Sequence, residues 1–483
     1  MAKLLVRNGE IITSMDRMRG DVYCEDGVIR AIGVKLDVPA GTEVIDASGQ
    51  LVFPGGLDPH VHMELPFMGT VSADDFESGT AAGICGGVTC IIDFCIPAQK
   101  QSLLEALKMW DEKSKKAVAD YSYHMAITWF SEQVEKEMGA VKERGIPSFK
   151  HFMAYKGALM LDDDGLYRSF CRIKELGGIA TIHAENGDVV WNLQQNLIRE
   201  GKTGPEYHAV SRPPEVEGEA TNRAIRIAEV VGIPVYIVHM TCKAALDAVI
   251  AARLRGQRGV YAESLINHLL LDDSVYQKPN FEAAAYVMSP PFRPKGNPEA
   301  LWDGIKAGMI QATGTDHCPF NMSQKAMGKD NFTMIPNGCA AIEDRMSLLW
   351  HHGVGKGRLT PNEFVRVTST NTAQIFNIYP RKGSVSVGAD ADLVVWDPNG
   401  TRTISAKTHH QQIDFNIFEG MTVRGIATHT ISQGKVVWAE GKLNAVKGAG
   451  RYVDRPTWAP YFDAARRQAE AKAPRAVVRQ AAE

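Results

Sequence analysis

The sequence predicts an α/β protein built on a closed (β/α)8 barrel, a TIM barrel, with a small β-sandwich domain formed by its two terminal segments. Three observations lead to this fold class. Eight apolar runs of strand length alternate with helical segments in the middle of the chain, over roughly 260 residues, a length that suits eight strand–helix units. Short strand patterns flank this region on both sides. Polar residues end several of the eight runs, as they do at the active face of such barrels.

The N-terminal segment, residues 1–53, shows the pattern of short strands. It begins with KLLVRNGEIIT, in which Asn8-Gly9 separates two apolar runs and predicts a β-hairpin turn. Residues 384–449 have the same character, with SVSVGADADLVVWDPNG followed by GKVVWAEGKL. Because terminal segments often lie close together in space, we expect residues 1–53 and 384–449 to form one discontinuous domain.

The middle region, residues 54–383, is expected to form the barrel. Helical segments such as SLLEALKMWDEKSKKAVAD and NRAIRIAEVVG separate its apolar runs. An open doubly wound sheet is the alternative, but no G-x-G-x-x-G motif follows the first strand. The eight runs are LVFPGGLDPHVH, GVTCIIDF, YHMAIT, IPSFKHFM, GIATIHAE, IPVYIVHM, GVYAES and MIQATGTDH.

The last segment, residues 450–483, is rich in Ala, Arg and Glu and includes YFDAARRQAEAKAPRAVVRQAAE. Its apolar content is too low for a core of its own, so we expect a short helix followed by a loose tail. Packing against a neighbouring subunit and simple disorder are both compatible with this composition.

Composition excludes several classes of partner. The chain has 483 residues, of which 45% are hydrophobic and 23% charged, an ordinary globular composition. A formal charge of −3 gives no electrostatic footprint for nucleic acid or an anionic membrane, so neither partner is expected. We see no signal peptide and no run of 18 apolar residues that would span a membrane. The eight cysteines contain no C-x-x-C pair and lie mostly in apolar runs, which favours a cytoplasmic protein.

Candidate metal ligands stand at the ends of the apolar runs. His60 and His62 close the first run, and in an extended strand residues two apart point the same way. Two solvated loop histidines are the alternative for this pair. In a (β/α)8 barrel, however, all strands open onto one face at their carboxyl ends, so polar residues of later runs would join them. Imidazole and carboxylate groups bind zinc and related ions. The later candidates are Lys150, His183, His239 and Asp316.

These motifs resemble the amidohydrolase pattern, and more closely that of the dihydropyrimidinases and D-hydantoinases. The resemblance covers nearly the whole chain up to about Gly448. It is carried by DPHVH, FKHFMAYKG, ATIHAENGD, IVHMT, MSPPFRP, ATGTDHCPF, IPNGCAAIEDR and DFNIFEGM.

The resemblance implies two zinc ions per chain, bridged by a Lys150 that CO2 has carboxylated. A protonated lysine, whose pKa is about 10.4 in water, would repel the cations, whereas a carbamate offers one oxygen to each. A buried, salt-bridged lysine is the alternative. Cobalt and manganese accept similar ligands, so the metal stays open. The implied ligand sets are His60, His62 and Asp316 for one ion and His183 and His239 for the other.

The implied reaction is the hydrolysis of a cyclic amide by a hydroxide that bridges the two ions. Tyr155 would donate a hydrogen bond to the oxyanion, and Asp316 would carry the proton to the leaving nitrogen. An ordinary core tyrosine is the alternative for Tyr155. Ser289 and Asn337 would bind the –CO–NH–CO– edge of the substrate, largely through backbone groups. His317 stays unassigned between a residue that orients a ligand and a loop residue.

Four apolar residues are expected near the substituent of the ring, although they would equally suit ordinary packing at the barrel mouth. The four apolar residues are Met63, Leu65, Phe152 and Leu159.

Glu64 stands where dihydroorotases of the same superfamily typically carry an arginine, so an anionic ring is disfavoured.

The expected substrates are therefore neutral rings: dihydrouracil, dihydrothymine and 5-substituted hydantoins, which would give N-carbamoyl-β-amino or N-carbamoyl-amino acids. An allantoinase or another cyclic amidohydrolase is the alternative, although ELPFMG replaces the usual E-P-G of allantoinases. A non-enzymatic dihydropyrimidinase-related binding protein is disfavoured, because all six ligand positions are filled. The family is usually tetrameric, so the resemblance also implies a homotetramer.

Overall fold

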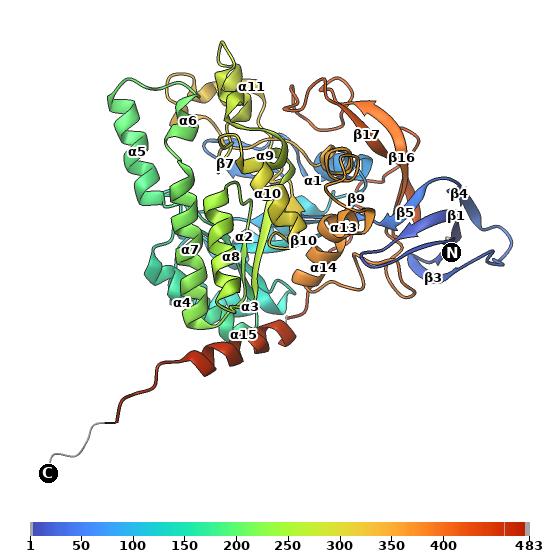
Figure 1. Cartoon of the computed structure of the whole chain (residues 1–483), viewed down its shortest axis with the longest axis horizontal. Helices are drawn as coiled ribbons and strands as arrows, with labels where there is room; N and C mark the ends of the chain where they lie inside the picture. Colours follow the sequence, from blue (N-terminus) through green and yellow to red (C-terminus); the bar gives the residue numbers. More distant parts are fainter. Residues whose placement is uncertain (1–2, 458, 479–483) are drawn as a thin grey trace.

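The computed structural model describes residues 3–457 and 459–478, in which two large sheets lie side by side (Figure 1). The first sheet has eight strands in chain order, and all its neighbouring pairs are parallel. They match the eight predicted runs and confirm the barrel. The strands are β6 (Gly56–Val61), β9 (Val88–Cys95), β10 (Asp120–Ile127), β11 (Ser148–Phe152), β12 (Ile179–His183), β13 (Val235–Ile237), β14 (Val260–Leu265) and β15 (Ala312–Gly314).

The barrel closes between β15 and β6. A parallel bridge joins Val61 to His317 just beyond β15. Further down, the guanidinium group of Arg345 donates to the carbonyl of Leu57 in β6 at 3.2 Å and to that of Thr313 in β15 at 2.5 Å. Arg345 is fully buried. One side chain thus satisfies carbonyls at a seam where the three-residue β15 is too short for a full ladder.

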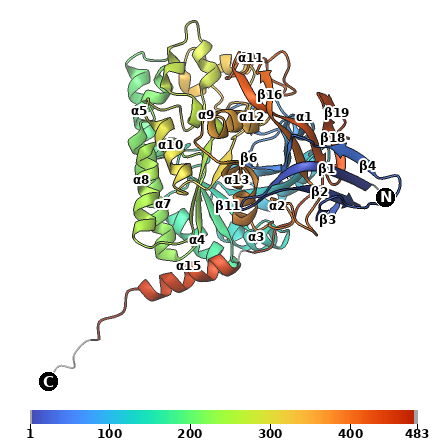
Figure 2. The same ribbon diagram turned by 45° about the vertical axis from the view of Figure 1, so that its right-hand side comes forward.

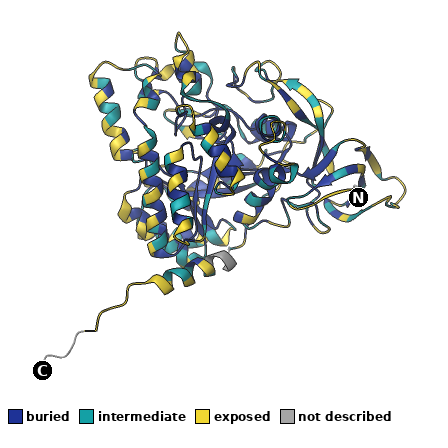
Figure 3. Ribbon diagram, viewed as in Figure 1, coloured by how far each residue is buried: buried dark blue, intermediate teal, exposed yellow. Residues whose placement is uncertain are grey.

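Helices cover the outside of the barrel. Helix α4 shows why they form: Asp162 caps its first turn, Leu166, Phe170 and Ile173 bury one face, and Gly177 ends it in the left-handed conformation. The strands are buried while the outward faces of the helices are exposed (Figure 3). The main helices are α1 (Phe76–Cys85), α2 (Leu103–Ser114), α3 (Glu132–Glu143), α4 (Asp163–Leu176), α5 (Gly187–Arg199), α7 (Pro214–Val231), α8 (Lys243–Leu254) and α10 (Asn297–Lys306).

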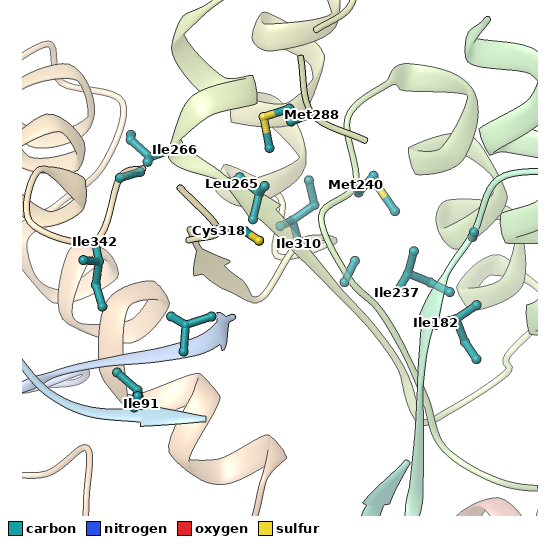
Figure 4. Packing of buried hydrophobic residues seen from close by; sticks show 14 of the residues in the cluster. Ile91, Ile182, Ile237, Met240, Leu265, Ile266, Met288, Ile310, Cys318 and Ile342 are labelled. Carbon is teal, nitrogen blue, oxygen red and sulfur yellow. The ribbon is translucent and has the colours of Figure 1, made fainter. Parts of the chain in front are cut away.

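Shorter helices build the rim of the barrel and its last turns. They are α6 (Tyr207–Val210), α9 (Ile266–Leu270), α11 (Met322–Lys325), α12 (Arg345–Leu349), α13 (Pro361–Val365) and α14 (Asn371–Ile375). Apolar side chains from strands and rim helices form one continuous core, which includes Ile91, Ile182, Ile237 and Met288 (Figure 4). No helix in the described residues is long and apolar enough to pass through a bilayer.

The second sheet joins the two terminal segments, beside the barrel (Figure 2). The antiparallel pairing of β5 with β16 connects its halves, as the sequence predicted, whereas the exact domain boundaries stay a prediction. Val6, Val22, Leu393 and Ile431 belong to its own apolar core. Its strands are β1 (Lys3–Ile12), β2 (Arg17–Glu25), β3 (Val28–Gly33), β4 (Glu43–Asp46), β5 (Leu51–Pro54), β16 (Leu393–Thr403), β17 (Thr422–Ser432), β18 (Lys435–Ala439) and β19 (Lys442–Leu443).

The Asn8-Gly9 pair does not form the predicted hairpin turn. Strand β1 runs through it, with a register shift against β2 between Val6 and Gly9. Asn8 has a φ of 61°, and its backbone N–H donates to Asp21 Oδ1 at 2.9 Å. Because Asn-Gly favours the left-handed conformation in a bulge as much as in a type I′ turn, the same sequence signal serves both structures.

The first predicted apolar run is divided between the two sheets. Its first part is β5 of the terminal sheet, and its second part is β6 of the barrel. At Gly55, between them, an added Cβ would lie 2.0 Å from Thr89 Oγ1. The chain can therefore pass from one sheet into the other only with a residue that lacks a side chain.

Residues 450–457, which the sequence assigned to the tail, pack along the barrel instead. Tyr452 forms a parallel bridge with Tyr121 of β10. The buried guanidinium group of Arg455 donates to Ser122 Oγ at 2.9 Å and to Ser148 Oγ at 2.8 Å. The predicted helix is confirmed as α15 (Ala459–Lys472), at the lower end of the molecule in Figure 1. The tail prediction also covers residues 458 and 479–483, which lie outside the described residues.

Candidate metal centre and active site

The carboxyl ends of the barrel strands bring the six predicted ligands together. The imidazole rings are close: the centroids of His60 and His239 are 5.2 Å apart, and those of His183 and His239 are 4.5 Å apart. All six residues line one cavity at this end of the barrel. They are His60, His62, Lys150, His183, His239 and Asp316.

Three potential ligand atoms cluster at His60, His62 and Asp316, all within 4.8 Å of one another. The Nε2 atoms of His60 and His62 lie 3.1 Å and 2.9 Å from Asp316 Oδ1. Asp316 has a φ of 49°, so the chain turns sharply after β15 and the carboxylate faces the cavity. Burial raises the pKa of Asp316 and the two imidazoles lower it, and the net pKa lies well below its usual range.

Glu263 in β14 fixes the orientation of His60 from behind. Its Oε1 accepts from His60 Nδ1 at 2.7 Å and from the His239 backbone N–H at 3.0 Å. Because Nδ1 carries the donated proton, the lone pair of His60 lies on Nε2, which faces the cavity. The polar neighbour of that Nε2 is Asp316 Oδ1, at 3.1 Å. Sequence reasoning missed Glu263, although an acid in the seventh run, GVYAES, was a usable signal.

His183 is held in the same way by Glu185. Its Nε2 donates to Glu185 Oε2 at 2.7 Å, which leaves the lone pair on Nδ1. The same oxygen accepts from Arg212 Nη1 at 2.6 Å. Burial raises the pKa of Glu185, but Arg212 and His183 bring it to about 2, so this carboxylate is charged. Burial lowers the pKa of both His183 and His239, so both rings are neutral, as metal ligands must be.

Lys150 is fully buried in β11. Its Nζ lies 4.4 Å from the ring centroid of Phe94 and 5.1 Å from that of Phe152. Among the described residues no carboxylate lies within ion-pair distance of it, so the salt-bridged alternative finds no partner. Burial lowers the pKa of Lys150 to about 7. A large part of this amine is therefore neutral at physiological pH, and the neutral amine is the form that can add to CO2.

This donor set fits divalent metal ions. Four imidazoles, a carboxylate and an amine without an ion-pair partner share one buried cavity, and the imidazole nitrogen His62 Nδ1 lacks a hydrogen-bond partner in the described chain. Unpaired buried polar atoms are rare because each one costs stability. The pKa values of His62, His183 and His239 are lowered by burial, so these three rings are neutral imidazoles, and together with the charged Asp316 carboxylate they are ligands that such ions prefer.

His317, which the sequence left unassigned, supports the loop that carries Asp316. Its Nε2 lies 2.9 Å from Asp74 Oδ2, its Nδ1 accepts from the Ala341 N–H, and its carbonyl accepts from the His62 N–H at 2.9 Å. It is fully buried. These contacts make it a residue that orients the ligand loops and not a loop residue without partners.

Tyr155, Ser289 and Asn337 line the same cavity as the ligands. The ring of Tyr155 lies 5.3 Å from that of His183, and Asn337 Nδ2 donates to Ser289 Oγ at 3.0 Å. Burial raises the pKa of Tyr155 to about 12, so its hydroxyl group stays protonated and can donate a hydrogen bond. This placement favours a functional role for Tyr155 over the core alternative.

Met63 does not belong to the pocket, and its assignment is wrong. Its side chain packs against α1, where a Cβ on Gly79 would lie 2.2 Å from Met63 Sδ. Strand β6 ends at Val61, and Met63 lies in the turn that follows it, where its side chain does not line the cavity. The apolar residues that line the cavity are Leu65, Phe67, Ile96, Phe152, Leu159 and Cys318.

A larger outer cavity adjoins the inner one. Both are lined by Phe67, Tyr155, Leu159 and Asn337, so these four residues stand at the passage between them. Trp191 and other residues of α5 form the outer wall. A ring bound at the ligand cluster would thus direct its substituent outward through this passage.

A closed barrel whose carboxyl end holds a buried imidazole–carboxylate–lysine cluster defines a class, the metal-dependent barrel enzymes. The sequence profile described as "Amidohydrolase family" matches residues 51–437. This chain therefore belongs to the amidohydrolase family.

Similar proteins place the chain within that family. It is 50% identical to a dihydropyrimidinase of Dictyostelium discoideum, over 95% of this chain and 92% of that one. It is 47% identical to a D-hydantoinase of Geobacillus stearothermophilus, over 93% and 96%. The crystal structure of dihydropyrimidinase from Brevibacillus agri superposes with a TM-score of 0.93 at 45% identity, covering 95% and 99% of the two chains. The predicted resemblance to the dihydropyrimidinases and D-hydantoinases is confirmed.

Proposed function

We propose that this chain hydrolyses the ring amide of 5,6-dihydropyrimidines and 5-substituted hydantoins. Dihydrouracil and dihydrothymine would give N-carbamoyl-β-amino acids, and hydantoins would give N-carbamoyl-amino acids. The observation that carries the proposal is the meeting of the ligand cluster with Tyr155, Ser289 and Asn337 in one cavity. The names of the similar proteins support both substrate classes.

Two zinc ions would be held by the cluster, with Lys150 carboxylated by CO2 between them. When bound, such ions supply an acidified water and a Lewis acid for the ring carbonyl. Glu263 and Glu185 keep His60 and His183 in the tautomer that a ligand needs. The ligands would be His60, His62 and Asp316 for one ion, His183 and His239 for the other, and the carboxylated Lys150 for both.

The side chains around the cluster would divide the remaining work. Tyr155 would donate from its hydroxyl group to the oxygen of the attacked carbonyl as negative charge develops there. Asp316 would accept the proton of the attacking water and deliver it to the ring nitrogen as the carbon–nitrogen bond breaks. Ser289 and Asn337 would bind the –CO–NH–CO– edge and so fix which carbonyl is attacked.

A neutral ring suits the inner cavity better than an anionic one. Glu64, which replaces the arginine of dihydroorotases, turns outward, where its Oε2 lies 2.7 Å from Lys116 Nζ. Repulsion by Glu64 therefore does not explain why an anionic ring is disfavoured. The described lining of the inner cavity contains no arginine, so the carboxylate of dihydroorotate would find no bidentate partner there.

The test is a comparison of rates on dihydrouracil, a 5-substituted hydantoin, dihydroorotate and allantoin, together with the metal content of the purified protein. We expect turnover of the first two, rates on the other two lower by about 10²-fold or more, and about two zinc ions per chain. Faster turnover of allantoin would make the chain an allantoinase. Absence of both metal and turnover would indicate a binding protein of the same fold.

Assembly and location complete the proposal. We infer a homotetramer from the resemblance to the family. We infer a cytoplasmic location because the structure pairs none of the eight cysteines in a disulfide. Light scattering of the purified protein would test the assembly.

A further inference from the structure

The segments that carry Ser289 and Asn337 form one wall of the inner cavity. The first follows the short helix at Glu282–Tyr286, and the second follows the one at Phe332–Met334. The Gly338 N–H donates to the Val287 carbonyl at 3.0 Å, and Asn337 Nδ2 donates to Ser289 Oγ at 3.0 Å. These two hydrogen bonds join the two segments into one unit.

Lys325, the last residue of α11, binds this unit from behind. Its side chain is completely buried, and its Nζ donates to the carbonyls of Val287, Pro336 and Gly338 at 2.8, 2.7 and 2.8 Å. An ammonium group has three N–H donors, so all three are used. No carboxylate in the described chain lies within ion-pair distance of Lys325, and a buried charge held only by carbonyls is costly. Its cost is offset by three charge-assisted hydrogen bonds.

Two buried histidines donate hydrogen bonds to the carbonyls that precede and follow Ser289 in the chain. His208 Nε2 donates to the Met288 carbonyl at 2.8 Å, and His268 Nε2 donates to the Pro290 carbonyl at 3.1 Å. The carbonyls on either side of Ser289 are therefore occupied by side-chain donors, and Lys325 occupies those on either side of Asn337.

Unlike the carbonyls next to them, the backbone groups of Ser289 and Asn337 are not hydrogen-bonded to side chains of the described residues. In the described part of the chain, the N–H and C=O groups of both residues make no hydrogen bond, although both residues line the cavity. Free backbone donors and acceptors in a buried wall complement a substrate edge that carries two carbonyls and an N–H. The neighbouring carbonyls are hydrogen-bonded to side chains, whereas the backbone groups of Ser289 and Asn337 remain available to a ligand.

We propose that Lys325 is a positioning residue for substrate, which aligns and polarises the wall that recognises the –CO–NH–CO– edge. This inference rests on the proposed function. The Pro336 carbonyl belongs to the same peptide group as the Asn337 N–H, so a cation on that carbonyl makes the N–H a stronger donor. Lys325 itself lies behind the wall and does not line the cavity.

The test compares Lys325→Met with wild type in steady-state kinetics on a 5-substituted hydantoin. Methionine keeps the length of the side chain but removes the charge and all three donors. We expect KM to rise by about tenfold or more, a smaller change in kcat, and an unchanged metal content, since a charge-assisted hydrogen bond is worth at least a factor of about ten. Lys174→Met is the matched control, because Lys174 Nζ also donates to a backbone carbonyl, that of Val231, but between α4 and the end of α7.

A folded Lys325→Met protein with wild-type KM would overturn the proposal, as would a loss of activity that only follows a loss of metal. A purely structural lysine would lower stability without moving KM of the folded fraction. Where Lys325→Met does not fold, His268→Leu removes one donor of the same wall without removing a charge. It should raise KM about threefold, as expected for one neutral hydrogen bond, and an unchanged KM would again overturn the proposal. If wild type hydrolyses no cyclic amide at all, the proposed function fails first.

Discussion

At the scale of single residues, carboxylates behind two of the ligands, His60 and His183, determine which nitrogen of each ring faces the cavity. Glu263 and Glu185 each accept the proton of one imidazole, and neither was identified from the sequence. The sequence shows the ligands because they end strands in a recognisable order. It does not show their supports, because a glutamate in a strand has many other uses and only the closed barrel brings Glu263 to His60.

Glu263→Gln should weaken metal binding by about 10- to 100-fold, because an amide is a poorer acceptor for the His60 Nδ1–H and ligand basicity falls. Metal titration of chelated protein measures this. Glu343→Gln is the control, since Glu343 forms a similar pair with His410 away from the cavity, at 3.0 Å. Equal metal affinity in Glu263→Gln and wild type would contradict the role.

Asp316→Asn should retain at least part of the metal but lower kcat by a factor of about 10² or more, because an amide cannot take the proton from water. Lys150→Ala should instead lose both metal and turnover. Metal analysis and rates on the same preparations separate the two outcomes. Near-normal turnover of Asp316→Asn would remove that residue from proton transfer.

At the scale of elements, strand number and order were predictable, but local chain paths were not. The eight apolar runs became eight strands because burial on both sides of a barrel strand demands continuous apolar sequence. The Asn8 bulge and the division at Gly55 escaped prediction because the same residues favour several turns. Met63 was misplaced because the turn that begins just after β6 was not visible in the sequence.

Arg345→Met should destabilise the protein by about 3 kcal/mol, because it removes buried charge-assisted donors from the carbonyls of Leu57 and Thr313 at the barrel seam. Urea unfolding followed by circular dichroism measures the loss. Arg144→Met is the control, since the Arg144 pair with Asp111 is exposed and worth little. Equal midpoints for the two variants would show that the seam does not depend on Arg345.

At the scale of the whole molecule, buried neutral histidines outside the ligand set make stability sensitive to acid. Burial lowers the pKa of His208 and His268 to about 3, against about 6.5 in the unfolded chain. The unfolded state therefore binds more protons between these values, and stability must fall as pH falls through that window.

The free energy of unfolding of metal-free protein, measured by urea titration, should accordingly decrease from pH 7 to pH 5, with a slope that approaches about 1.4 kcal/mol per pH unit for each such histidine once the pH is below about 6.5. The decrease should be shallower in His208→Gln, which keeps a side-chain donor but cannot be protonated. Equal slopes in the two proteins would show that His208 does not contribute.

The segment at residues 450–457 adds a consequence for synthesis. Arg455 completes the contacts beneath β10 and β11, β16 supplies the partner of β5, and Asp316 is made long after His60. During synthesis, β5, β10 and β11 therefore lack these partners until the residues of β16 and Arg455 have left the ribosome. Neither the complete set of six ligands nor a closed barrel can form in a nascent chain that stops short of Asp316, and chaperone demand should be greatest in that interval.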